Sequence, residues 1–239
     1  MKRLDLENFD TTLTTKMEKM FWWAGNENVE FTLNLGNKFD TSKVTNMFAL
    51  FSRMGYNSTK YELKLGNRFD TSKVTNMDSL FFQAGRSNPN FTLNLGNKFD
   101  TSKVTNMNYM FDQVGHKSTK FTLNLGNKFD TSKVTKMLCM FKATGYSNPN
   151  FTLELGNKFD TSKVTDMENM FNITGYSNTN FVLNLGDKFD VSKVVKDTGT
   201  FYRTGYLTPN FKPKATVKTQ AEKDVILAKF PIIDITIKP

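Results

Sequence analysis

Hydrophobic and polar residues follow two different periods within each 30-residue stretch of the chain. Phe31, Leu33 and Leu35 alternate with polar residues, which predicts a short strand with one buried face. A glycine-containing turn and the capping segment Asp40-Thr41-Ser42 follow. A second apolar set then has the spacing of one helical face: Val44, Met47, Leu50, Phe51 and Met54. The pattern predicts a coil made of strand, turn, helix and return loop.

This 30-residue pattern is repeated along the chain without gaps. The segment 31–47, FTLNLGNKFDTSKVTNM, recurs letter for letter at 91–107, and near-copies begin at Tyr61, Phe121, Phe151 and Phe181. A fixed period of this size is typical of a solenoid, in which each repeat is one supersecondary unit. Stacked coils of this kind form one parallel sheet on one side and a layer of helices on the other.

The two sides of such a stack have different spacings. Neighbouring strands lie about 4.8 Å apart, whereas packed helices need roughly 8–10 Å. The stack should therefore bend, with the sheet on the concave face and the helices on the convex face. Connections between parallel strands are nearly always right-handed. We predict an α/β repeat protein, a curved right-handed β/α solenoid with 30-residue coils.

Both ends of the repeat array depart from the pattern. Residues 1–30 form a coil with a turn one residue shorter than the others, which we interpret as an N-terminal capping coil. Six repeats occupy residues 31–210. Residues 211–239 should form a C-terminal cap, because Thr219-Gln220-Ala221-Glu222 is a capping box that opens a helix through about Lys229. Ile232 to Ile237 then predicts a last strand.

Composition limits the chemistry that the chain can support. The only cysteine is Cys139 and the only histidine is His116, and neither recurs in the other repeats. The repeated Asp of the DTS motif has no second acid beside it in its coil, whereas hard cations need several oxygen ligands. We therefore expect no catalytic residue, no cofactor and no metal site. The net charge of +9 favours acidic surfaces or polyanions.

The outward-facing strand positions are the candidate binding residues. A solenoid presents an extended surface on which the same residue recurs from coil to coil. The positions with outward side chains are Thr32, Asn34, Glu62, Lys64, Thr92, Asn94, Thr122, Asn124, Thr152 and Glu154. We expect a partner to bind across these rows.

The composite motif L-x-L-x(2,3)-F-D-T-S-K-V-T-x-M-x-x-M-F resembles the BspA-like class of leucine-rich-repeat bacterial surface proteins. It occurs at 4–21, 93–111, 123–141 and 153–171, and the resemblance extends over about residues 4–206. The resemblance implies a secreted or wall-attached protein that adheres to host matrix or cell-surface proteins, to other bacterial cells or to glycans. It implies an extracellular location, although the segment contains neither a signal peptide nor an apolar run of about 18 residues that could span a membrane.

Three functional hypotheses follow. The first is a non-enzymatic adhesion or protein-interaction module at the bacterial cell surface, for which no nucleic-acid partner is expected. The second is a basic module that binds a polyanion, such as a glycosaminoglycan, teichoic acid or nucleic acid. The third, an enzyme, has least support, because no nucleophile is paired with a base. Salt separates the first two, since binding to a polyanion weakens steeply with ionic strength.

Overall fold

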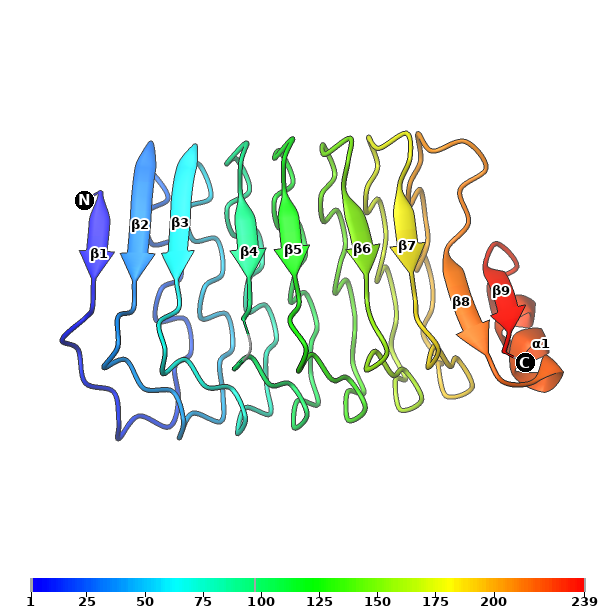
Figure 1. Cartoon of the computed structure of the whole chain (residues 1–239), viewed down its shortest axis with the longest axis horizontal. Coiled ribbons are helices and arrows are strands. Elements are labelled where there is room, and N and C mark those ends of the chain that lie inside the picture. The colour runs from blue at the N-terminus through cyan, green and yellow to red at the C-terminus, as the bar shows by residue number, and fades with distance from the viewer. Residues whose placement is uncertain (1, 97, 239) are drawn as a thin grey trace.

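The chain forms a solenoid of parallel β-coils, as seen in a computed structural model that describes residues 2–96 and 98–238 (Figure 1). One short strand belongs to each coil. These strands are β1 (Arg3–Asp5), β2 (Glu30–Asn34), β3 (Lys60–Lys64), β4 (Thr92–Asn94), β5 (Thr122–Asn124), β6 (Thr152–Glu154) and β7 (Val182–Asn184). They pair in parallel, Thr92 opposite Thr122 for example, but within three separate sheets: β1–β2–β3, β4–β5 and a third that begins with β6–β7. The predicted parallel pairing and the 30-residue coil are confirmed, whereas the single sheet predicted for the whole stack is divided into three.

The core lies between the strands and the opposite wall of each coil. Phe31, Leu33 and Leu35 are buried, as the alternation predicts. Phenylalanine rings of successive coils stack on one another through the interior. The Phe111 ring is fully buried, with its centroid 5.9 Å from that of Phe81 and 5.3 Å from that of Phe141. Each coil therefore buries its apolar side chains mainly against its two neighbours.

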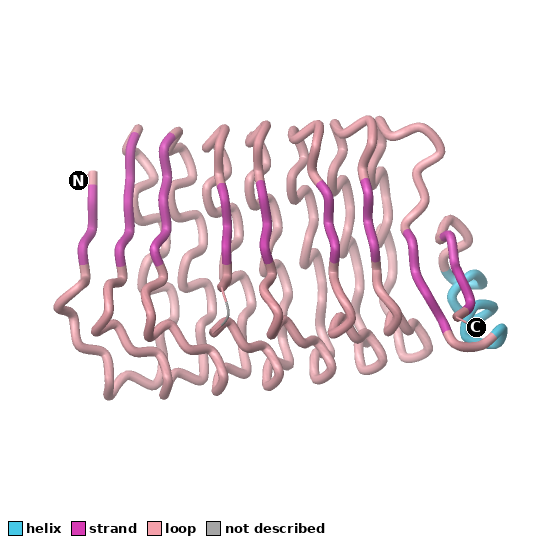
Figure 2. The backbone as a smooth tube through the Cα atoms, in the orientation of Figure 1, coloured by secondary structure: helices cyan, strands magenta, loops and turns pink. Residues whose placement is uncertain are grey.

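The prediction of a helix in every repeat is wrong. Residue 46 forms an isolated bridge and residues 48–57 form successive turns, and Figure 2 shows this wall of each coil as loop. Ala49 and Arg53 have φ angles of 53° and 56°, which no α-helix contains. The N–H of Met47 donates to the carbonyl of Asn76 in the next coil (3.0 Å), and that of Ala49 to Asp78 (2.9 Å). These hydrogen bonds run along the stack, whereas helical ones would stay within the coil.

The predicted curvature loses its physical basis with the helices. Isolated parallel bridges such as that between Asn76 and Asn106 join the turns of neighbouring coils. Both walls of the solenoid are thus held at the spacing of hydrogen-bonded strands, about 4.8 Å. In Figure 1, β1 to β7 stand side by side in chain order. We call the two walls the sheet face and the turn face, in place of concave and convex. The handedness of the coil stays a prediction.

The C-terminal segment forms β8 (Lys214–Val217), α1 (Gln220–Lys229) and β9 (Asp234–Ile237). The capping box predicted for α1 is present, because the Thr219 hydroxyl accepts from the Glu222 N–H and the Glu222 carboxylate accepts from the Thr219 N–H. The last strand begins two residues later than predicted. Phe230 packs edge-on against Phe201, with ring centroids 5.1 Å apart, and so contributes to closing this end of the core.

Candidate binding surfaces

The predicted binding residues lie on the strands of the sheet face. Thr32 and Asn34 are half-buried, whereas the other eight are exposed. The structure brings them together in neighbouring pairs: Thr32, Asn34, Glu62 and Lys64 on β2 and β3; Thr92, Asn94, Thr122 and Asn124 on β4 and β5; Thr152 and Glu154 on β6. The Thr122 hydroxyl donates to that of Thr92 at 3.1 Å. The sheet face is therefore a set of short, polar rows in register.

The asparagines of this set have a structural task that the sequence analysis missed. The Asn94 Oδ1 accepts from the N–H of Gly96, and Asn124 Oδ1 accepts from Gly126, both at 3.0 Å. These bonds close the turn that ends each strand, where the glycine adopts a positive φ, 69° at Gly96. No turn bond of this kind is made by the threonines of the set.

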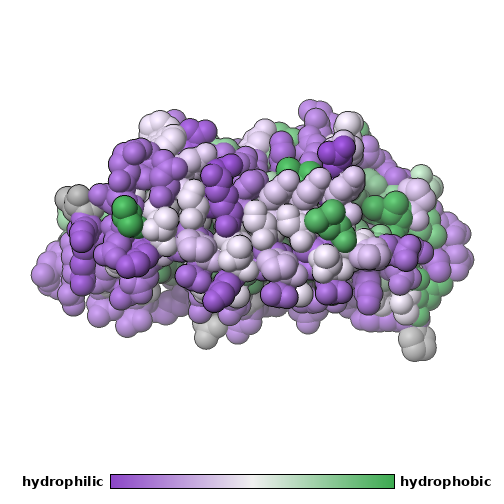
Figure 3. Space-filling view, turned by 90° about the horizontal axis from the view of Figure 1, so that it is seen from above, coloured by the Kyte–Doolittle hydropathy of each residue, from purple (hydrophilic) through white to green (hydrophobic). Residues whose placement is uncertain are grey.

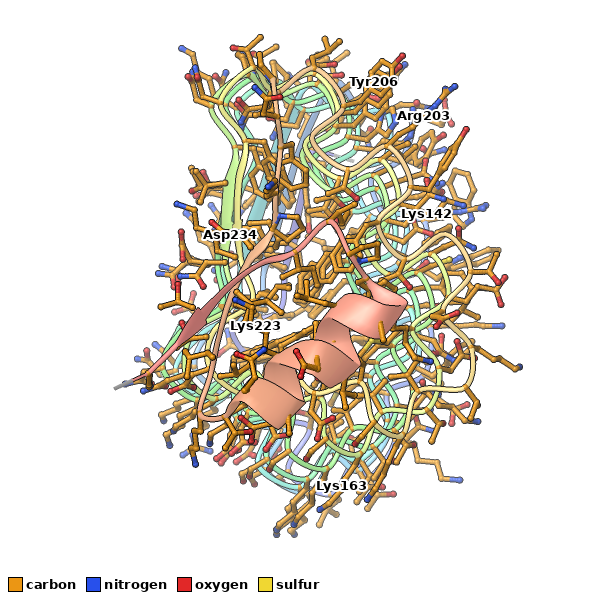
Figure 4. The ribbon with its side chains drawn as sticks, turned by 90° about the vertical axis from the view of Figure 1, so that its right-hand side faces the viewer. Lys142, Lys163, Arg203, Tyr206, Lys223 and Asp234 are labelled. Carbon is orange, nitrogen blue, oxygen red and sulfur yellow. The ribbon has the colours of Figure 1, made fainter. Side chains whose placement is uncertain are left out.

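A second surface, the basic edge, follows the turn between the two walls. Two rows of basic side chains, all exposed, run along it. One row is Lys38, Arg68, Lys98, Lys128, Lys158 and Lys188, and the other is Lys43, Lys73, Lys103, Lys133, Lys163 and Lys193. Lys163 marks this edge in Figure 4, at the end of the coil opposite Tyr206. Hydrogen-bonded coils are about 4.8 Å apart, so like charges recur at that interval along each row.

Aspartates lie between the two basic rows and are half-buried. The Asp40 Oδ1 accepts from the Ser42 N–H at 2.8 Å, and the corresponding bond recurs in the following coils. Hydrogen bonds from the side chain and backbone of Ser42 lower the pKa of Asp40, so that it stays ionised. Twelve basic and six acidic side chains leave six net positive charges on this edge.

This edge was not predicted from the sequence, where only the net charge of +9 was considered. The signal was nevertheless present: residues one period apart are neighbours in a solenoid. A lysine that recurs every 30 residues is thus a continuous row in three dimensions.

A third surface, the return-loop edge, bears a column of stacked planar side chains. Seen from above in Figure 3, this edge is coloured mostly purple and pale, with few green patches. The rings of His116 and Tyr146 stack with centroids 4.5 Å apart, and Tyr146, Tyr176 and Tyr206 continue the column at 4.7 and 4.9 Å. Face-to-face stacking leaves the ring edges outward, so the column's main contribution is to hold successive loops together.

The remaining reactive groups are poorly placed for catalysis. Burial raises the pKa of Cys139 to about 12 and lowers that of His116 to about 4. Cys139 therefore carries a protonated thiol at neutral pH, and His116 a neutral ring stacked against Tyr146. Within residues 2–96 and 98–238, no three His, Cys, Asp or Glu side chains cluster as a metal site requires.

A cleft of about 500 Å³ separates the last coil from α1. Phe189, Val217 and Val225 form its apolar wall, and Asp187 and Glu222 lie on its polar rim. The only α-helix in the described part of the chain is α1, and it is too short and too polar to cross a bilayer.

The family of the protein is shown by sequence comparison. The model of a family described as "Mycoplasma protein of unknown function, DUF285" matches residues 1–113, 52–172 and 117–226. The chain thus belongs to this family. No curated protein and no solved structure matches the chain.

Proposed function

We propose that this protein is a non-enzymatic interaction module of the bacterial cell surface, whose partner binds across the threonine row of the sheet face. The observation that carries the proposal is the exposure of Thr92, Thr122 and Thr152 on three neighbouring coils. Repeated, uncharged hydroxyl groups suit a partner that contacts several coils at once, as is usual for solenoids. The BspA-like resemblance supports adhesion to a host matrix protein, a cell-surface protein or another bacterial cell, and an extracellular location.

The test changes the threonine row and spares the turn-forming asparagines. Thr92→Lys, Thr122→Glu and Thr152→Lys are combined in one variant, and its binding to a panel of matrix proteins and to whole cells is measured. A matched control makes the same changes at Thr45, Thr75 and Thr105, which are exposed on three neighbouring coils of the turn face. The proposal expects binding to be lost in the first variant only. Loss in the control alone would place the partner on the turn face.

The basic edge supports a second candidate, the binding of a linear polyanion. Six net positive charges in two parallel rows attract phosphate or sulfate groups, and a long anionic chain can contact several lysines at once. The rows are held in place by the threonine of each DTS motif: the hydroxyl of Thr71 accepts from the Asp100 N–H at 2.7 Å and donates to its carbonyl at 2.8 Å. Successive coils are therefore fixed relative to one another along this edge.

Salt dependence tests this candidate. One variant replaces Lys73, Lys103, Lys133 and Lys163 by Gln, and its control makes the same change at Lys117, Lys120, Lys142 and Lys212, which lie elsewhere. Binding to polyphosphate and to heparin is measured over a range of salt concentrations. Each lost phosphate contact should reduce the log–log slope by roughly 0.7, and so by about 3 for four lysines. Equal slopes for the two variants would mean that net charge alone, and no particular edge, attracts the polyanion.

A further inference from the structure

The sheet face is interrupted between β3 and β4, although the turn face continues past this point. β3 ends one sheet and β4 begins the next (Figure 1). On the turn face, the bridge between Asn76 and Asn106 joins the same two coils. A second break of this kind separates β5 from β6. At each break, backbone groups that an intact sheet would pair face each other without a ladder of hydrogen bonds.

The return loops that lead into β4 and β6 share a sequence that accompanies both breaks. Residues 88–90 and 148–150 are both Asn-Pro-Asn. Proline has no N–H, so Pro89 cannot donate to the preceding coil. The corresponding loop at 178–180 is Asn-Thr-Asn, and there β6 and β7 pair. The Asn-Pro-Asn sequence therefore marks each break.

The first break leaves the N–H at the end of β3 without its usual partner. At an intact joint, the N–H after the strand reaches the next coil, as the Leu35 N–H does when it donates to the Lys64 carbonyl at 3.0 Å. By the same geometry, the Leu65 N–H and the Asn94 carbonyl point towards each other across the break. They form no hydrogen bond, and the Leu65 N–H has no other partner among the described residues.

The next N–H, that of Gly66, lacks a partner for a different reason. Its counterpart Gly36 donates to the Asn34 Oδ1 at 3.2 Å, and this bond recurs wherever the strand ends in asparagine. β3 ends in Lys64 instead, and a lysine side chain has no acceptor. The Gly66 N–H is therefore also unpaired within the described part of the chain. Successive N–H groups at a turn are a typical cradle for an anion.

The residues on the two sides of the break form a pocket of about 260 Å³, and Leu65 and Gly66 line it. A water molecule occupies about 30 Å³, so a tetrahedral anion fits with water beside it. Among the described lining residues, Lys98 alone is charged. Its Nζ donates across the break to the Asn67 carbonyl at 2.6 Å and retains further donors. The pocket thus combines one positive charge with two unpaired N–H groups.

The second break does not repeat these features. There the Gly126 N–H donates to the Asn124 Oδ1 at 3.0 Å, so it is already occupied. Glu154 stands where the first break has Asn94, and its carboxylate would repel an anion. The combination of unpaired N–H groups and a lysine therefore belongs to the break between β3 and β4.

We propose that the pocket between β3 and β4 binds hydrogen phosphate. The N–H groups of Leu65 and Gly66 and the Lys98 Nζ donate to its oxygens, and its own O–H donates to the Asn94 carbonyl. Sulfate and phosphate monoesters have no such proton at about pH 8, so this carbonyl selects inorganic phosphate against them. The proposal requires neither a partner on the threonine row nor a polyanion on the basic edge, because a single phosphate ion tests it.

The test follows the amide signals of the ¹⁵N-labelled full chain by NMR while inorganic phosphate is added at constant ionic strength and about pH 8. The signals of Leu65 and Gly66 should shift together and saturate with a Kd of about 1–10 mM. Those of Leu35 and Gly36, whose N–H groups are already bonded, should stay in place. Sulfate and methyl phosphate should bind at least about 10-fold more weakly, because each leaves the Asn94 carbonyl unpaired.

Two pairs of variants locate the site. K64N gives the Gly66 N–H the acceptor that it has in other coils, and should weaken phosphate binding at least about 10-fold. Its control, K64Q, removes the same charge but holds its amide one carbon further from the backbone, and should stay within about 5-fold of the wild type. K98Q should weaken binding at least about 10-fold, whereas K128Q, one coil further along the same row, should not.

K64N introduces the residue that ends the strand in four other coils, so its thermal melt should match that of the wild type. No shift at Leu65 and Gly66 up to about 50 mM phosphate would overturn the proposal. Equal shifts along both lysine rows, an affinity unchanged by K64N, or sulfate binding as tight as that of phosphate would overturn it too.

Discussion

At the scale of the residue, the threonine of the DTS motif holds adjacent coils together. The Thr101 side chain is fully buried, and its hydroxyl group bonds both to the N–H and to the carbonyl of Asp130 in the next coil, each at 2.7 Å. One side chain thus satisfies two backbone groups that point into the interface between coils. Leaving such groups without partners costs more than the bond itself contributes.

We expect Thr101→Val to lower the free energy of unfolding by about 2–4 kcal/mol, since valine keeps the shape and leaves two backbone groups of Asp130 unpaired. Thr105→Val is the matched control: its hydroxyl is exposed and makes one long bond, 3.3 Å to the Thr75 carbonyl. That variant should lose less than about 1 kcal/mol. Urea melts of the two variants measure the difference, and equal losses would contradict the role assigned to Thr101.

Asp112 is a buried carboxyl group with a consequence for pH. Burial raises its pKa from 3.8 to about 7, and among the described residues its Oδ1 has no hydrogen-bond partner. Between about pH 4 and pH 7 the native state therefore binds one proton more than the unfolded state. Its stability should fall as pH rises through this window and level off above it.

Asp112→Asn removes this ionisable group. We expect the variant to be more stable than the wild type by roughly 1–3 kcal/mol at pH 8, and the advantage to shrink towards pH 4. Melts at several pH values test this, with Asp224→Asn on the exposed surface of α1 as the control. An advantage that does not change with pH would show that burial of the charge is not the cause.

At the scale of the element, the turn wall explains why the sequence wrongly predicted a helix in each repeat. Val44, Met47 and Leu50 point inward at intervals of three, because each turn in this wall returns a side chain to the core. A helix produces the same intervals, so apolar spacing alone cannot separate the two structures. The spacing of apolar residues does not reveal whether the backbone N–H groups bond within the coil, as in a helix, or to the next coil, as they do in this wall. The strand, in contrast, was predictable, because a period of two has no such competitor.

The backbone at Ile173 distinguishes the two structures. This residue has a φ of 52°, which is unfavourable for a β-branched side chain. In a helix, glycine would be about 1 kcal/mol less stable than alanine. In this left-handed conformation the order reverses, and we expect I173G to be more stable than I173A by about 1 kcal/mol. Denaturant melts of the two variants give the sign, and a more stable alanine variant would argue for the helix.

The candidate surfaces were predictable to different degrees. Alternation placed Thr92 and Thr122 on the outside of the sheet face, and the structure finds them there. It also placed Asn94 there, but the bond of its side chain to Gly96 depends on a local turn that no periodicity reveals. The basic edge escaped notice because its members are neighbours only across coils. Interpreting residues such as Lys103 and Lys133 as one row requires the stack to be built first.

At the scale of the whole molecule, stability should vary along the stack. Each coil contacts only its neighbours, so an end coil loses support on one side. The first coil has a largely exposed outer side, whereas the last is covered by β8, α1 and β9. We expect the amides of residues 2–30 to exchange hydrogen fastest and those near Met107 and Phe111 slowest. Mass spectrometry of peptide fragments measures this gradient, and uniform exchange would instead indicate a single cooperative unit.

The equal spacing of the sheet and turn walls has a consequence for the evolution of repeat number. Segments 31–47 and 91–107 are identical, and every coil meets the next through the same kinds of contact. Recombination between repeats that adds or removes whole coils in frame therefore leaves the cross-section and both ends unchanged. Only the length of the solenoid along the stack changes, by about 4.8 Å for each coil. If one wall were longer than the other, each added coil would also tilt the coils that follow it. Hydrogen bonding along both walls gives them the same spacing, so a change in coil number changes the length of the molecule without that tilt.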